Sequence, residues 1–358
     1  MYSNKLYSPL RYPGGKARFG PLIAQVMHTN GLVGGHYLEP YAGGAGVALL
    51  LLLDGLVEKI HINDADPAVA VFWRVAVQQN SKLTQMVSNE TVTIDAWYHW
   101  RAVMLGQVSC TELERGFATL FMNRTNRSGI LKGGVIGGKD QSGTYKLWER
   151  FMREELCIRL ERIGRHSNSI NVYEEDAHQL LLRCHKFLPM KSLVYLDPPY
   201  YVKGAGLYRN FYRRKDHEQI ARLLSCPRFR RPWIVSYDNA DEIQTMYASA
   251  HSITYGLHYT AHRRYIGSEV MFFGHRLTPP TEAKEPQASE FVCPTGIGVY
   301  RQLFSRSAGL AVWGFDGVRA QPVERSRSAQ TKPLPFPARH SKSALPYPRI
   351  GLSSQFIL

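Results

Sequence analysis

The sequence predicts a doubly wound α/β sheet that is interrupted by a mostly helical insertion and followed by a long tail. Short apolar segments alternate with helix-like segments over residues 36–66 and again over residues 170–273. Residues 67–166 show helical periodicity without a convincing buried strand, and periodicity ends near residue 277. Such alternation favours a mainly parallel sheet whose binding sites lie at the carboxyl ends of the strands.

The first unit of the predicted sheet is a strand, a glycine-rich turn and a helix. A strand is expected over residues 36–39 and a helix over 47–56, with three glycines between them. Residues 59–64 then have the pattern of a second strand. Pro67 fits the first turn of the helix that follows, because its missing amide hydrogen costs nothing there.

The remaining strands follow the insertion. Three parallel strands and a closing antiparallel pair are predicted over residues 170–173, 192–196 and 233–237, and 252–260 with 268–273. Asp216, with Gln219 three residues later, resembles a capping box at the start of one intervening helix.

These patterns divide the chain into three parts. Residues 1–66 and 167–276 form the predicted main domain, and residues 67–166 form an insertion that carries a basic, glycine-rich hairpin. Residues 277–358 are rich in Pro, Ser and Arg and contain half of the 20 prolines. We expect this tail to be largely disordered, and we expect a chain that ends near His275 to keep its activity.

Composition favours a soluble protein with a polyanionic partner. Lys and Arg number 44 against 29 for Asp and Glu, which gives a formal charge of +15. Such an excess favours nucleic acid or an anionic surface. The apolar run Val47–Leu53 is far shorter than the roughly 20 residues that span a bilayer, and no signal peptide is visible at the N-terminus. The five cysteines lie far apart, which predicts reduced thiols in a cytoplasmic protein and no metal site.

The segment Leu196-Asp197-Pro198-Pro199-Tyr200-Tyr201, at the end of a predicted buried strand, has the residue types of a site for a planar base. Two adjacent prolines cannot continue a sheet ladder, but they hold their carbonyl oxygens in place. A fixed carboxylate and carbonyl beside an aromatic ring suit an exocyclic amino group. A strand that simply stops at a proline turn is the alternative for this segment taken alone.

The turn Gly43-Gly44-Ala45-Gly46 and Asp64 together indicate a nucleoside site. Glycines let the backbone approach a ligand, and an acid at the end of the next strand accepts bonds from ribose hydroxyls. A tight turn without a ligand is the alternative. The six-residue glycine pattern of a dinucleotide site is incomplete here, which favours a ligand without a pyrophosphate.

Four motifs in order resemble the DNA adenine methylase (Dam-like) family of S-adenosylmethionine-dependent adenine-specific DNA methyltransferases. They are Pro13-Gly14-Gly15-Lys16, Glu39-Pro40-Tyr41-Ala42-Gly43-Gly44-Ala45-Gly46, Asn63-Asp64 and Asp197-Pro198-Pro199-Tyr200. The resemblance covers about residues 10–273, and the tail has no counterpart. Tyr12 stands where many relatives have tryptophan, and Glu39 where other methyltransferases have aspartate. The implied fold is a Rossmann-like methyltransferase sheet with a helical DNA-recognition insertion.

The resemblance implies a set of residues for the cofactor. Tyr12 and Lys16 match positions at the methionine end of S-adenosylmethionine, where Lys16 suits the carboxylate. Asp64 matches the acid that holds the ribose, and the turn at Gly43 lies beneath the cofactor. Asp176 is a less specific match for the group that bonds the cofactor's adenine. For Lys16 and Asp64 the plain alternatives are a solvated lysine and a helix cap.

The resemblance also implies a catalytic set. Asp197, next to the cofactor, and the Pro198 carbonyl accept hydrogen bonds from the 6-amino group of the target adenine, and Tyr200 stacks on the base. These bonds favour a tetrahedral nitrogen with an available lone pair, while the sulfonium already activates the methyl group, so the protein mainly supplies alignment. No covalent intermediate is needed, and no metal. The target base has to leave the duplex, which costs a few kcal/mol.

DNA recognition is predicted for the hairpin that begins at Phe121. Arginine pairs with guanine edges and asparagine with adenine edges, so Arg124, Asn126 and Arg127 are candidates for base or phosphate contacts. A basic solvated loop is the alternative. Lys203, Tyr208 and Arg209 are candidates to line the same channel, whereas the basic segments 213–215 and 262–264 are expected near phosphates or simply at the surface.

We therefore expect a site-specific adenine methyltransferase that acts on double-stranded DNA as a monomer, with a cognate restriction endonuclease as a possible partner. Methylation of the 4-amino group of cytosine and non-catalytic DNA binding on the same fold remain the alternatives. The recognition sequence, the bacterial or phage origin and the role of the tail do not follow from the residues.

Overall fold

The computed structural model describes residues 7–12, 16–201, 212–259 and 265–280. The predicted tail from residue 281 onward, the glycines of the Pro13 motif and the basic segments 203–209 and 262–264 lie outside these residues. The fold described below belongs to the unit formed by residues 1–287.

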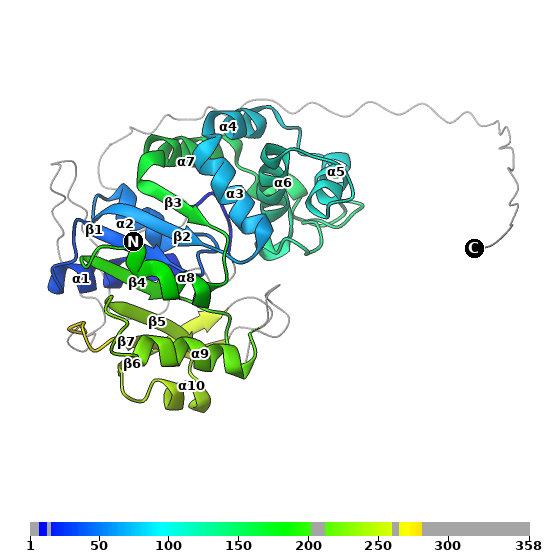
Figure 1. Cartoon of the computed structure of the whole chain (residues 1–358). Coiled ribbons are helices and arrows are strands. Elements are labelled where there is room, and N and C mark those ends of the chain that lie inside the picture. The colour runs from blue at the N-terminus through cyan, green and yellow to red at the C-terminus, as the bar shows by residue number, and fades with distance from the viewer. Residues whose placement is uncertain (1–6, 13–15, 202–211, 260–264, 281–358) are drawn as a thin grey trace, which may run out of the picture. The chain divides into compact units, whose positions relative to one another are not determined.

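Within the described residues, seven strands form one sheet in the order β3-β2-β1-β4-β5-β7-β6 (Figure 1). The strands are β1 Gly35–Glu39, β2 Val57–Asn63, β3 Ile170–Tyr173, β4 Ser192–Leu196, β5 Trp233–Asp238, β6 His251–Tyr259 and β7 Tyr265–Phe273. The first five run parallel, and β7 is antiparallel to both β5 and β6. This mainly parallel α/β sheet confirms the predicted Rossmann-like methyltransferase fold, with strand bounds within about two residues of those predicted except at the start of β7.

Helices connect the strands and cover both faces of the sheet. They are α1 Gly20–Thr29, α2 Gly46–Leu53, α3 Pro67–Gln78, α4 Asn80–Asn89, α5 Ile94–Met104, α6 Glu112–Thr125, α7 Arg153–Arg165, α8 Ala177–Arg183, α9 Arg214–Ser225 and α10 Asp241–Met246, with a 3-10 turn η1 at Lys16–Phe19. Residues 67–166 contain helices, connecting turns and one isolated bridge between Asn126 and Val135, and no strand of the sheet. Its assignment as a separate insertion stays a prediction, because contacts join it to the same compact unit as the sheet.

Alternation along the strands divides the hydrophobic core into two layers. Leu193 and Tyr195 of β4 pack in one cluster with α1, α2 and α3, whereas Val194 and Leu196 pack in the other with α8, α9 and α10. Successive side chains of a strand point to opposite faces, so a strand covered on both faces is apolar throughout. That is why β4 has the sequence Ser-Leu-Val-Tyr-Leu and is buried at every position.

The order of the strands in the sheet determines where the site lies. β1 is followed in the sheet by β2 on one side and by β4 on the other, so the strand order reverses between β1 and β4. Loops after these two strands leave in opposite directions, which opens a crevice at their carboxyl ends. The glycine turn follows β1 and the acid-proline motif follows β4.

Two local predictions need correction. Helix α9 begins at Arg214, so Asp216 is not its cap; the Asp216 side chain accepts a bond from the backbone N–H of Arg213 at 2.8 Å. The body of the protein also extends past His275. Leu277 is buried, and Thr278 exchanges two hydrogen bonds with the side chain of Asn30, at 2.7 and 3.0 Å.

Candidate active site

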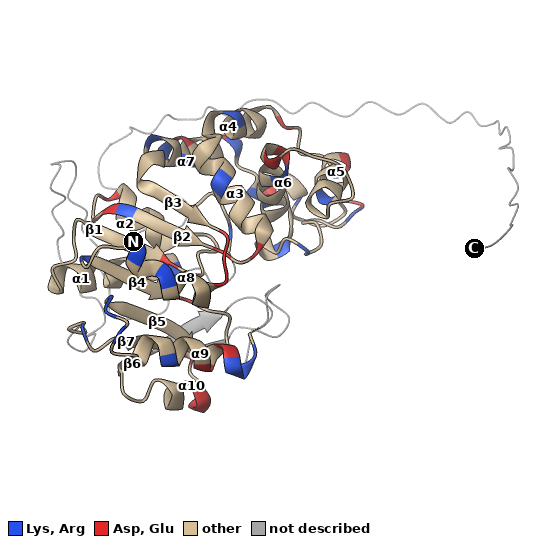
Figure 2. Cartoon of the chain, viewed as in Figure 1, with Lys and Arg blue, Asp and Glu red and all other residues tan. Residues whose placement is uncertain are grey.

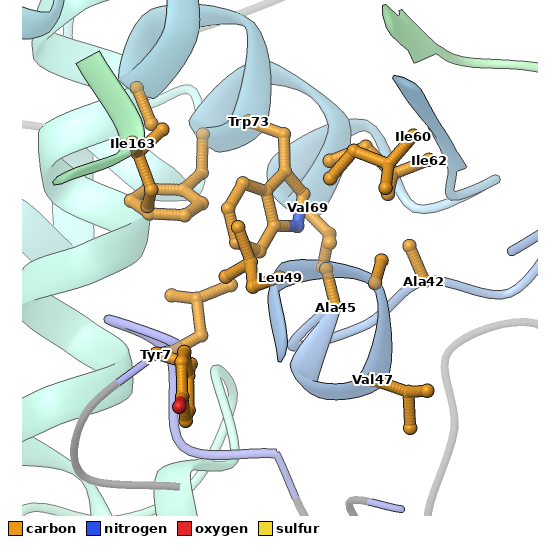
Figure 3. Packing of buried hydrophobic residues seen from close by; sticks show 14 of the residues in the cluster. Tyr7, Ala42, Ala45, Val47, Leu49, Ile60, Ile62, Val69, Trp73 and Ile163 are labelled. Carbon is orange, nitrogen blue, oxygen red and sulfur yellow. The ribbon is translucent and has the colours of Figure 1, made fainter. Parts of the chain in front are cut away.

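The turn after β1 is held in one conformation by two aromatic side chains. Gly43 has a φ of 46°, and a Cβ at this position would lie 2.7 Å from Cε1 of Tyr12. Only glycine fits both the left-handed backbone and the approach of the ring. The Gly43 carbonyl accepts a bond from Trp73 Nε1 at 2.9 Å, and Figure 3 shows the Trp73 side chain reaching from α3 towards this turn. The structure thus brings Tyr12 and Gly43 together.

Asp64 lies at the end of β2 and faces the same turn. Its Oδ2 accepts a bond from the N–H of Gly43 and its Oδ1 from the N–H of Asp66, both at 2.9 Å. Burial raises the pKa of Asp64 to about 6, although these two hydrogen bonds lower it. Each carboxyl oxygen can accept a further bond. The side chain is therefore suited to neighbouring hydroxyl donors.

Asn63 ties together the loops that follow three strands. Its Nδ2 donates to the carbonyls of Pro40 (2.8 Å) and Glu175 (3.0 Å), and its Oδ1 accepts from the N–H of Glu175 at 2.9 Å. Only 1% of Asn63 is exposed. Because the three bonds join the ends of β1, β2 and β3, Asn63 sets the spacing of the loops around Gly43 and Asp64.

Glu39 ends β1 and has a structural connection to α2. Its Oε1 accepts bonds from Tyr37 Oη and from the N–H of Ala48, both at 3.0 Å. Burial raises the pKa of Glu39 to about 8, so this carboxyl group takes up a proton near neutral pH. Glu39 therefore fixes the start of α2 relative to β1.

Asp197 is anchored through one of its two carboxyl oxygens. Oδ1 accepts a bond from Ser236 Oγ at 2.9 Å and lies 3.4 Å from Lys16 Nζ. Among the described residues, Oδ2 has no hydrogen-bond or ion-pair partner, and 23% of the side chain is exposed. Burial raises the pKa of Asp197, Lys16 and Ser236 lower it, and Glu269 adds to the rise. The result is a fixed carboxyl group with one oxygen open to a donor.

Lys16, Tyr200 and Glu269 form a buried network beside Asp197. Lys16 Nζ contacts the Tyr200 hydroxyl, lies 3.0 Å from Glu269 Oε2 and sits 4.7 Å from the centre of the Tyr200 ring. The Tyr200 hydroxyl also donates to Glu269 Oε1. Lys16 and Tyr200 are each 6% exposed, and Glu269 is fully buried. The predicted Lys16, Asp197 and Tyr200 are thus brought together, with Glu269 as a member that the sequence did not reveal.

One known family matches most of the chain. The model of the D12 class N6 adenine-specific DNA methyltransferases (MethyltransfD12) matches residues 12–266. The chain belongs to this family. As a D12-class methyltransferase the protein is an enzyme that methylates N6 of adenine in DNA, which confirms the predicted family and activity. Membership also implies DNA as substrate and S-adenosylmethionine as methyl donor.

Other comparisons add little. A comparison with curated proteins finds no match. Among solved structures, the rRNA methyltransferase AviRa from Streptomyces viridochromogenes is similar at 15% sequence identity and a TM-score of 0.35, over 77% of this chain and 92% of that one. At a TM-score this low, the substrate of AviRa has no bearing on this chain.

The residues present fit the methyl donor of a D12-class enzyme. A ligand at the Gly43 turn meets the carboxyl group of Asp64, which suits ribose hydroxyls, and the half-buried ring of Tyr12. Asp176 is exposed and caps α8 through a bond from the N–H of Gln179 at 3.2 Å. It therefore has an oxygen near the same strand ends, but no contact that marks it as a ligand group.

A pair of tyrosines that the sequence analysis overlooked lies near Asp64. The hydroxyl groups of Tyr41 and Tyr212 are 3.0 Å apart and their rings meet edge to face. Burial raises the pKa of Tyr212 to about 12, and the carboxyl groups of Asp176 and Asp64 add to this rise. The pair therefore lies at the same edge of the sheet as the Gly43 turn. Tyr41 is visible in the second motif, but nothing in the sequence shows that Tyr212 reaches it.

Pro198 and the backbone after it are firmly held. Pro198 is buried, and the N–H of Tyr201 donates to Asp238 Oδ1 at 2.8 Å. Asp238 ends β5, next to the strand that carries Asp197. The acid-proline motif is thus fixed from a neighbouring strand.

Two of the three residues predicted to contact DNA point into the protein, which corrects that prediction. Arg124 is 6% exposed and its Nε donates to the carbonyl of Pro9 at 2.7 Å; burial lowers its pKa to about 9. Asn126 is fully buried, accepts a bond from Trp97 Nε1 at 2.8 Å and donates to two hairpin carbonyls. Arg124 lies on α6 and Asn126 just after it, so both face the helical core. Arg127 is exposed, as predicted.

Large aromatic side chains are exposed on the segment that follows the hairpin. Tyr145 is 62% and Trp148 is 54% exposed. Gln141 holds the preceding turn through bonds to the carbonyls of Ile136 and Gly138 and to the N–H of Leu147. Exposed aromatics near basic residues are typical of nucleic-acid surfaces, and the residues Lys132, Lys139 and Arg150 are exposed as well. In Figure 2 the Lys and Arg residues of the described chain lie on several elements, α3 and α9 among them.

The described residues contain neither a metal-ligand cluster nor a membrane-spanning helix. No group of three or more His, Cys, Asp or Glu residues is arranged to hold a metal ion. No helix in the described ranges has the length and apolar character needed to cross a membrane.

Proposed function

We propose that Asp197 accepts a hydrogen bond from the 6-amino group of an adenine that has been flipped out of duplex DNA. The observation that supports this role is that the two oxygens of the Asp197 carboxyl group differ in their partners. Oδ1 is occupied by Ser236 and Lys16, while Oδ2 has no partner among the described residues. A donor that approaches Oδ2 meets an acceptor whose orientation is already fixed.

The chemistry requires such an acceptor because the lone pair of the adenine amine is delocalised into the ring. Hydrogen bonds from its two N–H groups to Asp197 and to the Pro198 carbonyl favour a pyramidal nitrogen that can attack. S-Adenosylmethionine supplies an already activated methyl group, so the contribution of the protein is alignment and exclusion of water. In the same proposal Tyr200 stacks on the base. Lys16 covers one part of its ring in this structure, so the base has to use the opposite face.

For the methyl donor we propose Asp64, the N–H and turn of Gly43, and the Tyr12 ring as the principal contacts. Asp64 is placed to accept bonds from ribose hydroxyls, and Tyr12 covers the turn. Lys16 has three protein contacts, to Asp197, Tyr200 and Glu269. We therefore propose that its ammonium group mainly pairs with the Asp197 carboxylate, and that any contact with the methionine carboxylate of the cofactor is a minor one.

For DNA we propose a surface formed by Arg127, Tyr145 and Trp148. All three are exposed and lie in the hairpin and the segment after it. The basic group suits phosphate or a base edge, and the aromatic rings suit unstacked bases. Replacing Trp148 by Ala should weaken DNA binding by roughly 5-fold or more, since stacking is worth about 1–3 kcal/mol. Replacing Met190, which is 53% exposed and distant in sequence, serves as the control. Equal affinity of Trp148→Ala and parent would remove Trp148 from the surface.

The experiment that tests the function is transfer of a labelled methyl group to unmodified duplex DNA, followed by digestion to nucleosides. The proposal predicts label in N6-methyldeoxyadenosine. Label in N4-methyldeoxycytidine would establish the cytosine alternative. DNA binding without label from a folded protein that binds S-adenosylmethionine would establish the non-catalytic alternative.

Several finer features remain proposals. Recognition of a short duplex sequence, action as a monomer, and a cognate endonuclease are expected from the resemblance. Localisation in the cytoplasm is expected from the cysteines.

A further inference from the structure

We propose that Glu269 is a positioning residue for methyl transfer, which acts on Asp197 through Lys16 and Tyr200. This inference rests on the proposed role of Asp197. Glu269 lies on β7, 69 residues after Tyr200 of the acid-proline motif, and is fully buried. A fully buried carboxyl group is rare unless it is paired.

Within the described part of the chain, at least three donors meet the two oxygens of Glu269. Lys16 Nζ and Tyr255 Oη bond to Oε2 at 3.0 and 3.2 Å, and Tyr200 Oη bonds to Oε1. Both catalytic neighbours of Asp197 are thus held by one side chain. Without Glu269, the Lys16 ammonium has Asp197 as its remaining carboxyl partner among the described residues, and the Tyr200 hydroxyl loses the acceptor of the bond that it donates.

The sheet explains why this carboxyl group reaches the site. β7 is antiparallel to β5, and Glu269 pairs with Asp238, which holds the N–H of Tyr201. Two adjacent strands therefore hold the acid-proline motif. The carboxyl group of Asp238 accepts a bond from the backbone N–H of Tyr201, and the carboxyl group of Glu269 accepts one from the side-chain hydroxyl of Tyr200. Ser236, two residues before Asp238, fixes Asp197 itself.

The arrangement gives Glu269 and Lys16 opposite effects on the carboxyl group of Asp197. Lys16 lowers the pKa of Asp197, and Glu269 raises it. Among the described residues, the titratable groups that act electrostatically on Asp197 are Lys16 from η1, Tyr37 and Glu39 from β1, Tyr195 from β4 and Glu269 from β7. The Lys16 ammonium lies between the carboxyl groups of Asp197 and Glu269. Its contact with Glu269 keeps it from moving closer to Asp197, so Asp197 remains a strong hydrogen-bond acceptor.

The test is Glu269→Gln, with the exposed Glu58→Gln in β2 as the matched control. Glutamine has the same shape but one acceptor oxygen, so three donors cannot all be satisfied. We expect kcat to fall by roughly 10- to 100-fold, the size of loss that follows slight misplacement of reacting groups. KM values for DNA and for S-adenosylmethionine should stay within about threefold of the parent, because Glu269 itself contacts neither ligand in this proposal and most binding groups lie elsewhere.

The pH profile separates positioning from a merely structural role. In Glu269→Gln the acid limb of kcat should move to lower pH, whereas in Lys16→Gln it should move to higher pH. A kcat equal to the parent, or an acid limb that moves upward in Glu269→Gln, overturns the proposal. If Glu269→Gln does not fold, Glu269→Asp serves instead. It keeps the charge, so the acid limb should stay in place while kcat falls at least about fivefold, and a parental kcat overturns the proposal.

A readout independent of activity completes the test. The ¹³C signal of the Asp197 carboxyl carbon, identified by its loss in Asp197→Asn, should titrate at lower pH in Glu269→Gln than in the parent. An unchanged midpoint overturns the influence of Glu269 on Asp197. A parental protein that methylates no DNA counts against the proposed function, whereas the titration judges Glu269 in either case.

Discussion

Replacing Asn63 by alanine tests how the loops around the site are held. Asn63 is 1% exposed and makes three hydrogen bonds, to the carbonyls of Pro40 and Glu175 and to the N–H of Glu175. At about 1 kcal/mol net for each bond, the variant should lose about 3 kcal/mol of unfolding free energy. The loss should be no smaller, since alanine leaves three buried backbone groups without partners and adds a cavity.

The assay is thermal unfolding followed by circular dichroism. For a unit of this size 1 kcal/mol corresponds to about 2–4 °C, so the midpoint should fall by roughly 6–12 °C. Affinity for S-adenosylmethionine, measured by calorimetry, should fall as well because the Gly43 turn lies just after Pro40. The exposed Asn89, at the end of α4, gives the control Asn89→Ala. A midpoint for Asn63→Ala as close to the parent as that of the control would refute the tying role.

Three further predictions follow from single features of the structure. Gly43→Ala should reduce affinity for S-adenosylmethionine by at least about 10-fold, measured by calorimetry, because the left-handed backbone costs about 1–2 kcal/mol and the new Cβ meets the Tyr12 ring at 2.7 Å; unchanged affinity would contradict the geometry. Burial lowers the pKa of His61 to about 3, so between about pH 6.5 and pH 3 the unfolded state binds a proton that the folded state does not. The free energy of unfolding should therefore decrease by roughly 1.4 kcal/mol for each unit by which the pH is lowered through this range. Urea unfolding at several pH values should show that slope reduced in His61→Phe, and equal slopes would refute it. A chain that ends at Pro280 should keep the parental melting midpoint, whereas one that ends at residue 275 should melt lower because it lacks Leu277 and the Thr278 bonds to α1; equal midpoints would contradict this.

The fold was predictable because its signals are local. The apolar segment that became β4 is buried at every position, and it had to be a covered strand because it carries no polar side chain on either face apart from Ser192. The glycines after β1 predict a turn, and Pro67 predicts the start of α3. Each of these signals lies within a few residues of the element it predicts, so no knowledge of distant contacts was needed.

The missing members of the site depend on contacts that are distant in sequence. Ser236 and Glu269 act because β5 lies between β4 and β7, and no local pattern gives that order. A signal for Glu269 was nonetheless present, since a lone acid inside an apolar closing strand needs a buried partner. Arg124 was misassigned for the same reason. Its partner is the carbonyl of Pro9, 115 residues away, and a basic residue at the end of a helix otherwise suggests solvent or DNA.

The most direct measurement of the central claim is the single-turnover rate of methyl transfer by Asp197→Asn, with DNA affinity measured in parallel. Asparagine keeps the shape of the side chain but removes the carboxylate that receives the target amine. The rate should fall at least roughly 10²- to 10³-fold, as for the loss of other groups that stabilise a transition state, while the dissociation constant for DNA stays within about threefold. A variant that transfers methyl groups at the parental rate would show that this carboxyl group does not activate adenine.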